Sequence, residues 1–224
     1  MLGRTTWRGR SIVLLGAAAL AVWGNADDLR VGASSLHGNS FVLRAELAAL
    51  ELAGAGVDPA YRPDPQGAPS IRAGGYFDAI AVLGSPAEAR ERLPNMPALA
   101  RAAADRVLLE ARPPTLTAGG ADPQGRVQIE GAAEAHCAQA VAGAALTVVV
   151  PAAGLAIVAP TGTSLRLRRF ADTWYDAGPI VISPGPPQVL RLAADASPVP
   201  WRARIEGPAI VCAARAERSH RSAF

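Results

Sequence analysis

The sequence has few of the residue types from which reactive sites are built. It contains two cysteines, three histidines and two methionines in 224 residues, and all 22 of its basic residues are arginine. The histidines, His37, His136 and His220, lie far apart, and the two cysteines are best explained as partners of each other. The sequence therefore has no pattern of a metal site, and we expect no cofactor.

The chain also lacks an excess of charge of either sign once its first residues are set aside. It has 22 basic and 19 acidic residues, and three of the arginines lie among the first ten residues. Because 22 − 3 = 19, the remainder is balanced, which argues against nucleic acid as a partner. We attribute the exclusive use of arginine and the abundance of alanine to a GC-rich genome. Because alanine is abundant for that reason, we give less weight to helix predictions that rest on it.

Long apolar runs are absent after residue 23. Three arginines precede an apolar run from Ile12 to Trp23, and Gly24-Asn25-Ala26 then supplies the small residues that a signal peptidase reads. Such a run is short for a bilayer span, and no second one follows. We expect residues 1–26 to be a secretory signal peptide, and the protein to be periplasmic or secreted with no transmembrane span after cleavage. An uncleaved anchor is the alternative.

The C-terminal part of the chain reads as a series of short strands separated by Pro and Gly. Apolar and polar residues alternate, as in half-buried strands, in three segments: 126–130, 165–168 and 201–206. The runs 146–150 and 155–158 are apolar at nearly every position, and the Pro-Ala-Ala-Gly between them predicts a hairpin covered on both faces. Three further runs bring the number of strands to about eight, typical of a β-sandwich: 180–182, 189–192 and 209–212.

Both cysteines, Cys137 and Cys212, lie in this region. In an exported protein they most simply form a disulfide, which would tie the first strands of the sandwich to the last. The alternative is that Cys137 is a nucleophile activated by His136. Adjacent residues of a strand point to opposite faces, which argues against that pairing.

Strand and helix patterns alternate in the N-terminal half. Strands are predicted at 29–33, 77–83 and 107–109. Helices are predicted from Ser40 to Gly54, from Ser85, and from Pro97 to about Arg106. This alternation predicts a small α/β region with parallel strand pairing.

The expected fold class is therefore α+β, with a small α/β N-terminal region followed by a disulfide-stapled antiparallel β-sandwich of about eight strands. The expected boundaries are 1–26 for the signal peptide, 27–112 for the α/β region, 113–124 for a Pro/Gly-rich linker, 125–214 for the sandwich and 215–224 for a polar tail.

One polar loop carries the candidate ligand-binding residues: Ser34, Ser35, His37, Asn39 and Ser40. It lies between the first predicted strand and the first predicted helix, where free N–H groups and the helix dipole favour an anion or a polar ligand. The alternative is that Asn39 or Ser40 caps the helix and His37 is a surface residue.

A hydrolase triad of Ser34 or Ser35 with His37 and Asp78 is a further hypothesis. It lacks the Gly-x-Ser-x-Gly elbow, and its serine and histidine share one short loop. Among the aromatics, Trp201 occupies an inward position and is expected in the core. Trp174 and Tyr175 follow Asp172 and Thr173 in a predicted loop and are the better candidates for residues that contact a partner.

The sequence contains no group of residues with the pattern of a catalytic site. We therefore expect a non-enzymatic exported protein, an accessory or structural subunit of a cell-envelope assembly that acts through protein–protein contacts with other envelope proteins. A periplasmic binder of a small polar or anionic ligand, using the loop 34–40, is the second hypothesis, and a hydrolase using the same loop is the third.

Overall fold

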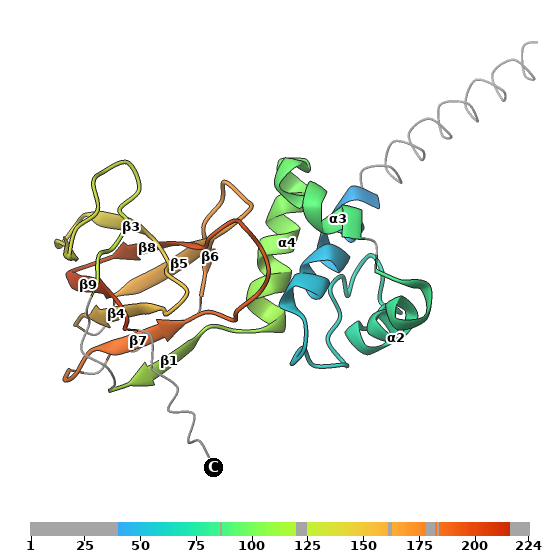
Figure 1. Ribbon diagram of the computed structural model, residues 1–224, viewed down its shortest axis with the longest axis horizontal. Coiled ribbons are helices and arrows are strands. Elements are labelled where there is room, and N and C mark those ends of the chain that lie inside the picture. The colour runs from blue at the N-terminus through green and yellow to red at the C-terminus, as the bar shows by residue number, and fades with distance from the viewer. Residues whose placement is uncertain are drawn as a thin grey trace, which may run out of the picture. The chain divides into compact units, whose positions relative to one another are not determined.

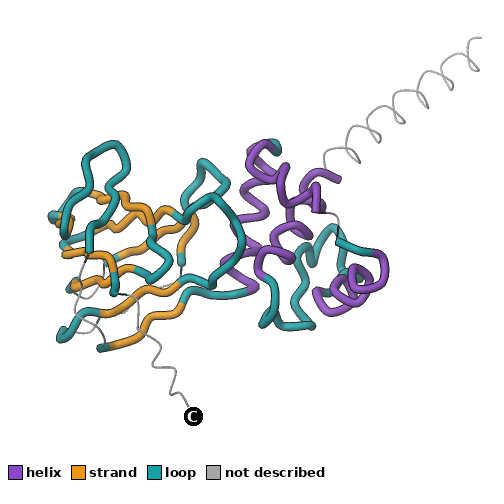
Figure 2. The backbone as a smooth tube through the Cα atoms, viewed as in Figure 1, coloured by secondary structure: helices purple, strands orange, loops and turns teal. Residues whose placement is uncertain are grey.

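A computed structural model of the protein describes residues 40–85, 87–119, 125–160, 163–177, 182 and 184–215. The expected signal peptide and the strand predicted at 29–33 lie outside these residues, as does most of 180–182. Helices come first along the chain and strands follow, so that the two kinds of element lie in separate parts of it (Figure 1, Figure 2). This confirms the α+β fold class with a sheet-rich C-terminal part.

The described N-terminal part is helical. A helix over 40–53 is followed by α2 (Ala73–Leu83), α3 (Ala87–Arg92), the 3-10 helix η1 (Leu93–Asn95) and α4 (Ala98–Ala111). Gly54 ends the first helix as predicted, with a φ of 65° and an N–H that donates to the Leu50 carbonyl at 3.0 Å. None of the helices in the described residues is long and apolar enough to cross a bilayer.

Two strand predictions in this half are wrong. The run 77–83 lies in α2 and the run 107–109 lies in α4, and the described residues from 40 to 112 include no strand. The parallel pairing expected there is therefore not present in those residues. A short apolar run fits a strand and a helix segment equally well, so the apolar pattern of these two runs does not separate the two structures.

Alanines let the first helix and α4 pack closely. The first helix buries Ala45, Ala48, Ala49, Leu50 and Ala53, whereas Leu43 and Leu47 are only half-buried. Arg106 of α4 and Arg112, the residue that follows this helix, bind the first helix at its Glu46 carboxylate and its Ala53 carbonyl, at 2.6 and 2.8 Å. The second contact lies further toward the C-terminus than the first on both helices, so the helices run side by side in the same direction.

The C-terminal part is a sandwich of two antiparallel sheets. One sheet has the order β1-β7-β4-β9-β2 and the other β3-β8-β5-β6. The strands are β1 (Thr115–Ala118), β2 (Cys137–Ala140), β3 (Ala145–Val149), β4 (Leu155–Val158), β5 (Ser164–Arg168), β6 (Tyr175–Asp176), β7 (Gln188–Arg191), β8 (Arg202–Glu206) and β9 (Ala209–Ala213). The core is aliphatic, and Leu155, Leu167 and Ile205 are almost completely buried in it.

The disulfide prediction is confirmed. Cys137 of β2 and Cys212 of β9 are direct partners in the antiparallel register, 4.4 Å apart at Cα, and they are bonded to each other. Because β2 is the last strand of its sheet, the bond fixes an edge strand to its only neighbour. A disulfide is compatible with an exported protein.

The predicted hairpin between 146–150 and 155–158 is wrong. β3 pairs with β8 in one sheet, and β4 lies between β7 and β9 in the other, so the turn between them crosses the sandwich. Strands that are apolar on both faces suit either arrangement, and their sequence does not select between them. The segment 126–130 forms only isolated bridges, at Val127 and Ile129.

The segment 113–124, predicted as a linker, contains β1, which pairs with β7 through four residues. The described residues from Val42 onward form one compact unit. The domain boundaries expected from the sequence stay a prediction.

Gly154 offers a test of the crossing turn. Its φ is +99°, and a Cβ placed on it would lie 2.3 Å from the Leu190 carbonyl oxygen. Gly143, before β3, has a similar φ of +80° but no atom within 4 Å of such a Cβ. We expect Gly143→Ala to cost about 1 kcal/mol of unfolding free energy and Gly154→Ala at least about 2 kcal/mol more, measured in urea. Equal losses would contradict the close approach of this turn to β7.

Candidate functional site

The residues predicted to bind a ligand lie mostly outside the described part of the chain. Ser34, Ser35, His37 and Asn39 precede it, and Ser40 lies in the first helix, as expected. Ligand binding by these five residues therefore stays a prediction.

The residues of the catalytic alternatives are not brought together where the structure describes them. Asp78 of the hydrolase hypothesis is exposed on α2. Cys137 is bonded to Cys212 and has no free thiol, and the neighbouring His136 is exposed. In the described ranges, no group of three His, Cys, Asp or Glu side chains is arranged to hold a metal ion.

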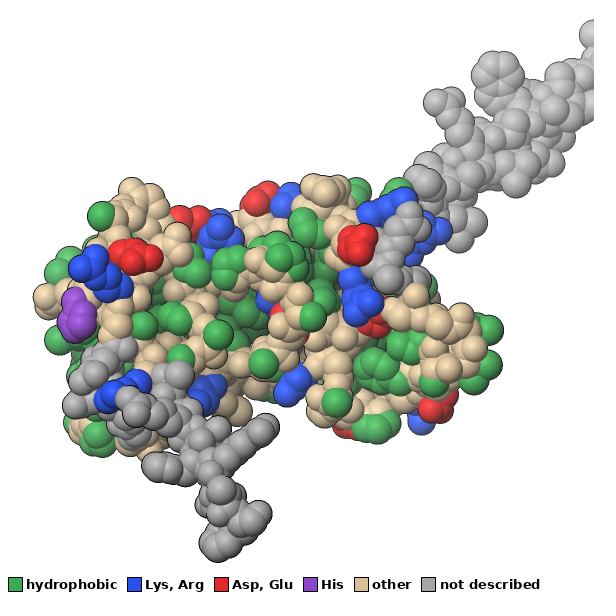
Figure 3. Space-filling view, in the orientation of Figure 1, with side chains coloured by type: hydrophobic (Ala, Val, Ile, Leu, Met, Phe, Trp, Pro, Cys, Tyr) green, Lys and Arg blue, Asp and Glu red, His purple; other side chains and the backbone are tan. Residues whose placement is uncertain are grey.

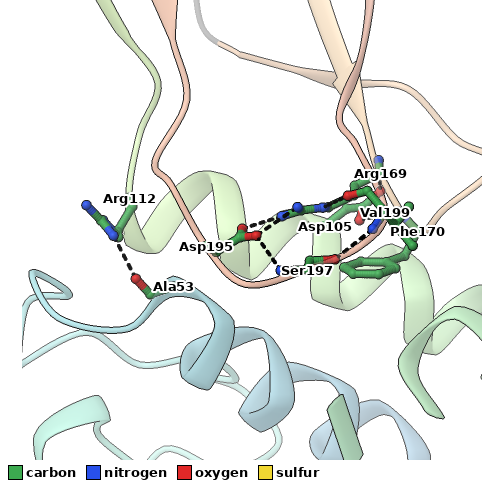
Figure 4. Close-up of polar contacts among 8 residues, drawn as sticks. All are labelled: Ala53, Asp105, Arg112, Arg169, Phe170, Asp195, Ser197 and Val199. Atoms are coloured by element: carbon green, nitrogen blue, oxygen red, sulfur yellow. Dashed lines mark hydrogen bonds and ion pairs between the residues drawn. The ribbon is translucent and has the colours of Figure 1, made fainter. Parts of the chain in front are cut away.

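A buried polar site lies where α4 meets the bend that follows β5. We call Arg169, Phe170 and Ala171 the β5 bend. The buried carboxylate of Asp105 accepts hydrogen bonds from the backbone N–H groups of all three residues, at 2.9, 2.9 and 3.0 Å. Figure 4 shows Asp105 with the first two of them, Arg169 and Phe170. Burial raises the pKa of Asp105, and the three donors oppose that rise. One side chain of α4 thereby holds the backbone of the bend.

Arg169 joins this bend to the loop between β7 and β8. Its guanidinium forms a bidentate ion pair with Asp195, in which Nη2 lies 2.8 Å from Oδ1, and its Nε donates to the Val199 carbonyl at 2.6 Å (Figure 4). The two charged side chains are only 5% and 6% exposed. Because each charge of this buried pair is neutralised by the other, the pair fixes the loop and leaves no free charge for a ligand.

Trp201 lies beside this ion pair. Its ring centre is 5.2 Å from the Arg169 guanidinium carbon, and the residue is 8% exposed, which confirms the prediction that it belongs to the core. Trp174 is half-buried, and the Arg168 guanidinium lies 4.3 Å from its ring centre. Since that cation already lies over the Trp174 ring, the prediction that Trp174 contacts a partner gains no support from its position.

Among the clefts that the described residues form, two are lined by both Ser197 and Pro198 of the loop between β7 and β8. The first, of about 250 Å³, also contains Arg169, Asp195 and Trp201 in its walls. The second, of about 320 Å³, has mainly apolar walls: Leu52, Pro94, Phe170, Ala196 and Pro198, together with Arg90 and Glu91. The charged groups of the first cleft are already paired, so it offers space without reactive chemistry.

The most exposed large apolar side chains of the described residues lie at the end of α2. Val82 and Leu83 are 83% and 84% exposed, and Ala73 is the only buried residue of the helix. Hydrophobic side chains gather over α2 on the face shown in Figure 3. We call Ala79, Ala81, Val82 and Leu83 the α2 apolar surface. The sequence reading missed it because the run 77–83 was interpreted as a buried strand.

Polar contacts hold both ends of α2 while this surface stays in solvent. The Ala73 N–H donates to the Tyr61 carbonyl at 2.8 Å near the start of the helix. The hydroxyl groups of Tyr76 and Ser85 donate to the two carboxylate oxygens of Glu51 in the first helix. The exposure of Val82 and Leu83 is therefore a feature of a fixed helix, and contiguous exposed apolar patches are a feature of protein contact sites.

Comparison of the chain with protein-family models, with curated proteins and with solved structures finds no match, so the features above are the basis for any function assigned to it.

Proposed function

We propose that the protein is an exported, non-enzymatic accessory or structural subunit of a cell-envelope assembly and acts through protein–protein contacts. The observation that carries this proposal is the α2 apolar surface. Val82 and Leu83 expose more than four fifths of their surface on a helix that is held in place by hydrogen bonds. Burial of such an apolar surface by a partner lowers the free energy and therefore favours binding.

Two observations support the compartment. The disulfide between Cys137 and Cys212 is of the kind that persists in oxidising compartments. The N-terminal arginines and the apolar run 12–23 have the pattern of a secretory signal. Envelope proteins are the partners that a protein of this compartment meets.

The size of the expected contact can be estimated from its side chains. Full burial of a valine or leucine side chain contributes about 1.5–3 kcal/mol. Two such side chains are therefore worth a factor of at least about 100 in affinity. They serve as an anchor, and the rest of a stable interface would come from neighbouring surface.

We expect Val82→Ser combined with Leu83→Ser to release the protein from its assembly. Wild-type protein in gently solubilised envelope extracts should travel in a particle larger than a monomer, and the double variant should travel as a monomer. Native mass spectrometry or gel filtration measures the difference. Both positions are exposed, so the melting temperature should change little.

Val141→Ser is the matched control. Val141 is also an exposed aliphatic residue, at 55%, but it follows β2 in the sandwich. This variant should assemble as the wild type does. Wild-type protein that is a lone monomer in envelope extracts would remove the basis for the proposal, and equal losses in both variants would place the contact elsewhere.

A further inference from the structure

Glu46 is a buried acid that the proposed contact does not use. Its side chain is 1% exposed and lies on the first helix, facing α4. Oε1 accepts a hydrogen bond from Nη2 of Arg106 at 2.6 Å, whereas Oε2 is buried and has no hydrogen-bond partner among the residues that the structure describes. An ionised carboxylate in this position is left with half of its acceptors unsatisfied, which disfavours the charged form.

The charged groups around Glu46 add to this effect. Among the described residues, the acids whose charges act on it are Asp64 in the loop before α2 and Glu110 on α4, and the cation is Arg106. The Asp64 carboxylate is held by the N–H groups of Gln66 and Gly67, and Glu110 accepts the Tyr61 hydroxyl at 2.8 Å. The guanidinium of Arg106, which pairs with Glu46, also binds the Pro63 carbonyl at 3.2 Å.

The pKa of Glu46 follows from these surroundings. Burial raises it from 4.5 to about 7, the Asp64 and Glu110 carboxylates contribute to the rise, and Arg106 opposes it. Burial likewise raises the pKa of Tyr61, so its hydroxyl stays protonated over the same range.

We propose that the contact between the first helix and α4 is a pH-sensitive device, in which Glu46 takes up one proton as the pH falls from alkaline to mildly acidic and the helical region becomes more stable. Protonation removes the uncompensated charge at Oε2. Arg106 keeps its bond to Pro63, so the contact between α4 and the loop survives the change. The space outside the cytoplasm follows external pH, so an exported protein would experience this range.

The direction of the effect is fixed by linkage. An unfolded glutamate loses its proton near pH 4.5, whereas folded Glu46 keeps its proton up to about pH 7. The stabilisation is therefore complete below the lower value and is lost as the pH rises through the higher one. Between pH 5 and pH 8 this group alone should raise the unfolding equilibrium constant by roughly 70-fold.

Urea unfolding of wild-type protein and Glu46→Gln at pH 5 and pH 8 tests the proposal. The glutamine keeps the shape and cannot ionise, so the 70-fold contribution should disappear from its pH dependence. Glu91→Gln, at an exposed position of α3, should retain it. Apart from Glu46 and Glu91, the acids of the chain, Asp105 among them, are present in all three proteins, so their contributions cancel in the comparison.

Carbon-13 NMR of the glutamate carboxyl groups provides a second measurement on wild-type protein alone. One carboxyl signal should titrate with a midpoint near pH 7, and it should be missing from the spectrum of Glu46→Gln. A Glu46 signal that titrates below pH 5, or parallel pH profiles of wild type and Glu46→Gln, would overturn the proposal.

Discussion

Asp105→Ala is expected to lower the free energy of unfolding by about 3–5 kcal/mol, the largest effect of a single substitution that we predict. The carboxylate accepts three backbone N–H groups of the β5 bend, and it is completely buried. Alanine leaves those donors without an acceptor in a place that water does not reach. Each buried donor without a partner costs about 1–3 kcal/mol.

The same contact joins the helices to the sandwich, since Asp105 lies on α4 and the bend follows β5. We therefore expect Asp105→Ala to weaken both parts together. Asp105→Asn should lose roughly half as much, because the amide keeps one acceptor oxygen of the same size. Circular dichroism in urea, followed at helix and strand wavelengths, measures both effects.

Asp172→Ala is the control for the Asp105 series. Asp172 lies just after the bend and pairs with Arg101 of α4 at 3.2 Å, but its side chain is 81% exposed. Its removal should change the unfolding free energy by less than about 0.5 kcal/mol. Equal losses of unfolding free energy for Asp105→Ala and Asp172→Ala would show that the buried carboxylate does not stabilise the contact between α4 and the sandwich.

The second large effect is expected at the disulfide. Replacing Cys137 and Cys212 together by serine should cost about 4 kcal/mol, because the bond closes a loop with a sequence separation of 75 residues in the unfolded chain. The edge strand β2 also loses its covalent tie to β9. Urea unfolding of oxidised, reduced and doubly substituted protein measures this cost, and mass spectrometry of unreduced protein should find no free thiol.

The course of this unfolding also tests how the two parts are joined. Since Asp105 ties α4 to the sandwich, helices and strands should unfold in one transition in the serine variant. A helical signal that persists after the strands have unfolded would show that the helices form an independent domain. Free thiols in protein taken from an oxidising compartment would contradict the bond itself.

Much of the sandwich could be predicted from the sequence because its strands are short and their faces differ. Leu165 and Leu167 alternate with Arg166 and Arg168, and β5 buries the leucines as expected. Pro and Gly residues marked the ends of several strands correctly. The disulfide was predictable because the only two cysteines of the chain lie in this region.

The pairing of β3 and β4 could not be predicted in the same way. Both strands are apolar on both faces, so their sequences do not show which sheet each joins. The partner of β3 is β8, and the partners of β4 are β7 and β9. All three lie far along the chain from the strands that they pair with. The strand β2, with the sequence Cys-Ala-Gln-Ala, has too little apolar character to be recognised by its pattern.

The polar sites were missed for a different reason. Asp105 lies among alanines in a helical segment, and its partners are backbone N–H groups 64 to 66 residues further along the chain. Such a cap has no local pattern, unlike the N-caps of helices. Glu46 likewise resembles an ordinary surface glutamate until Arg106, 60 residues away, is placed beside it.

The most direct test of the proposed role is a photo-crosslinking amino acid placed at position 82 and, separately, at position 141, followed by irradiation of intact cells. Both positions are exposed and aliphatic in the native protein. A partner that covers the α2 apolar surface should give a protein adduct of defined higher mass from position 82 and none from position 141. No adduct from position 82, or the same adducts from both positions, would contradict the account.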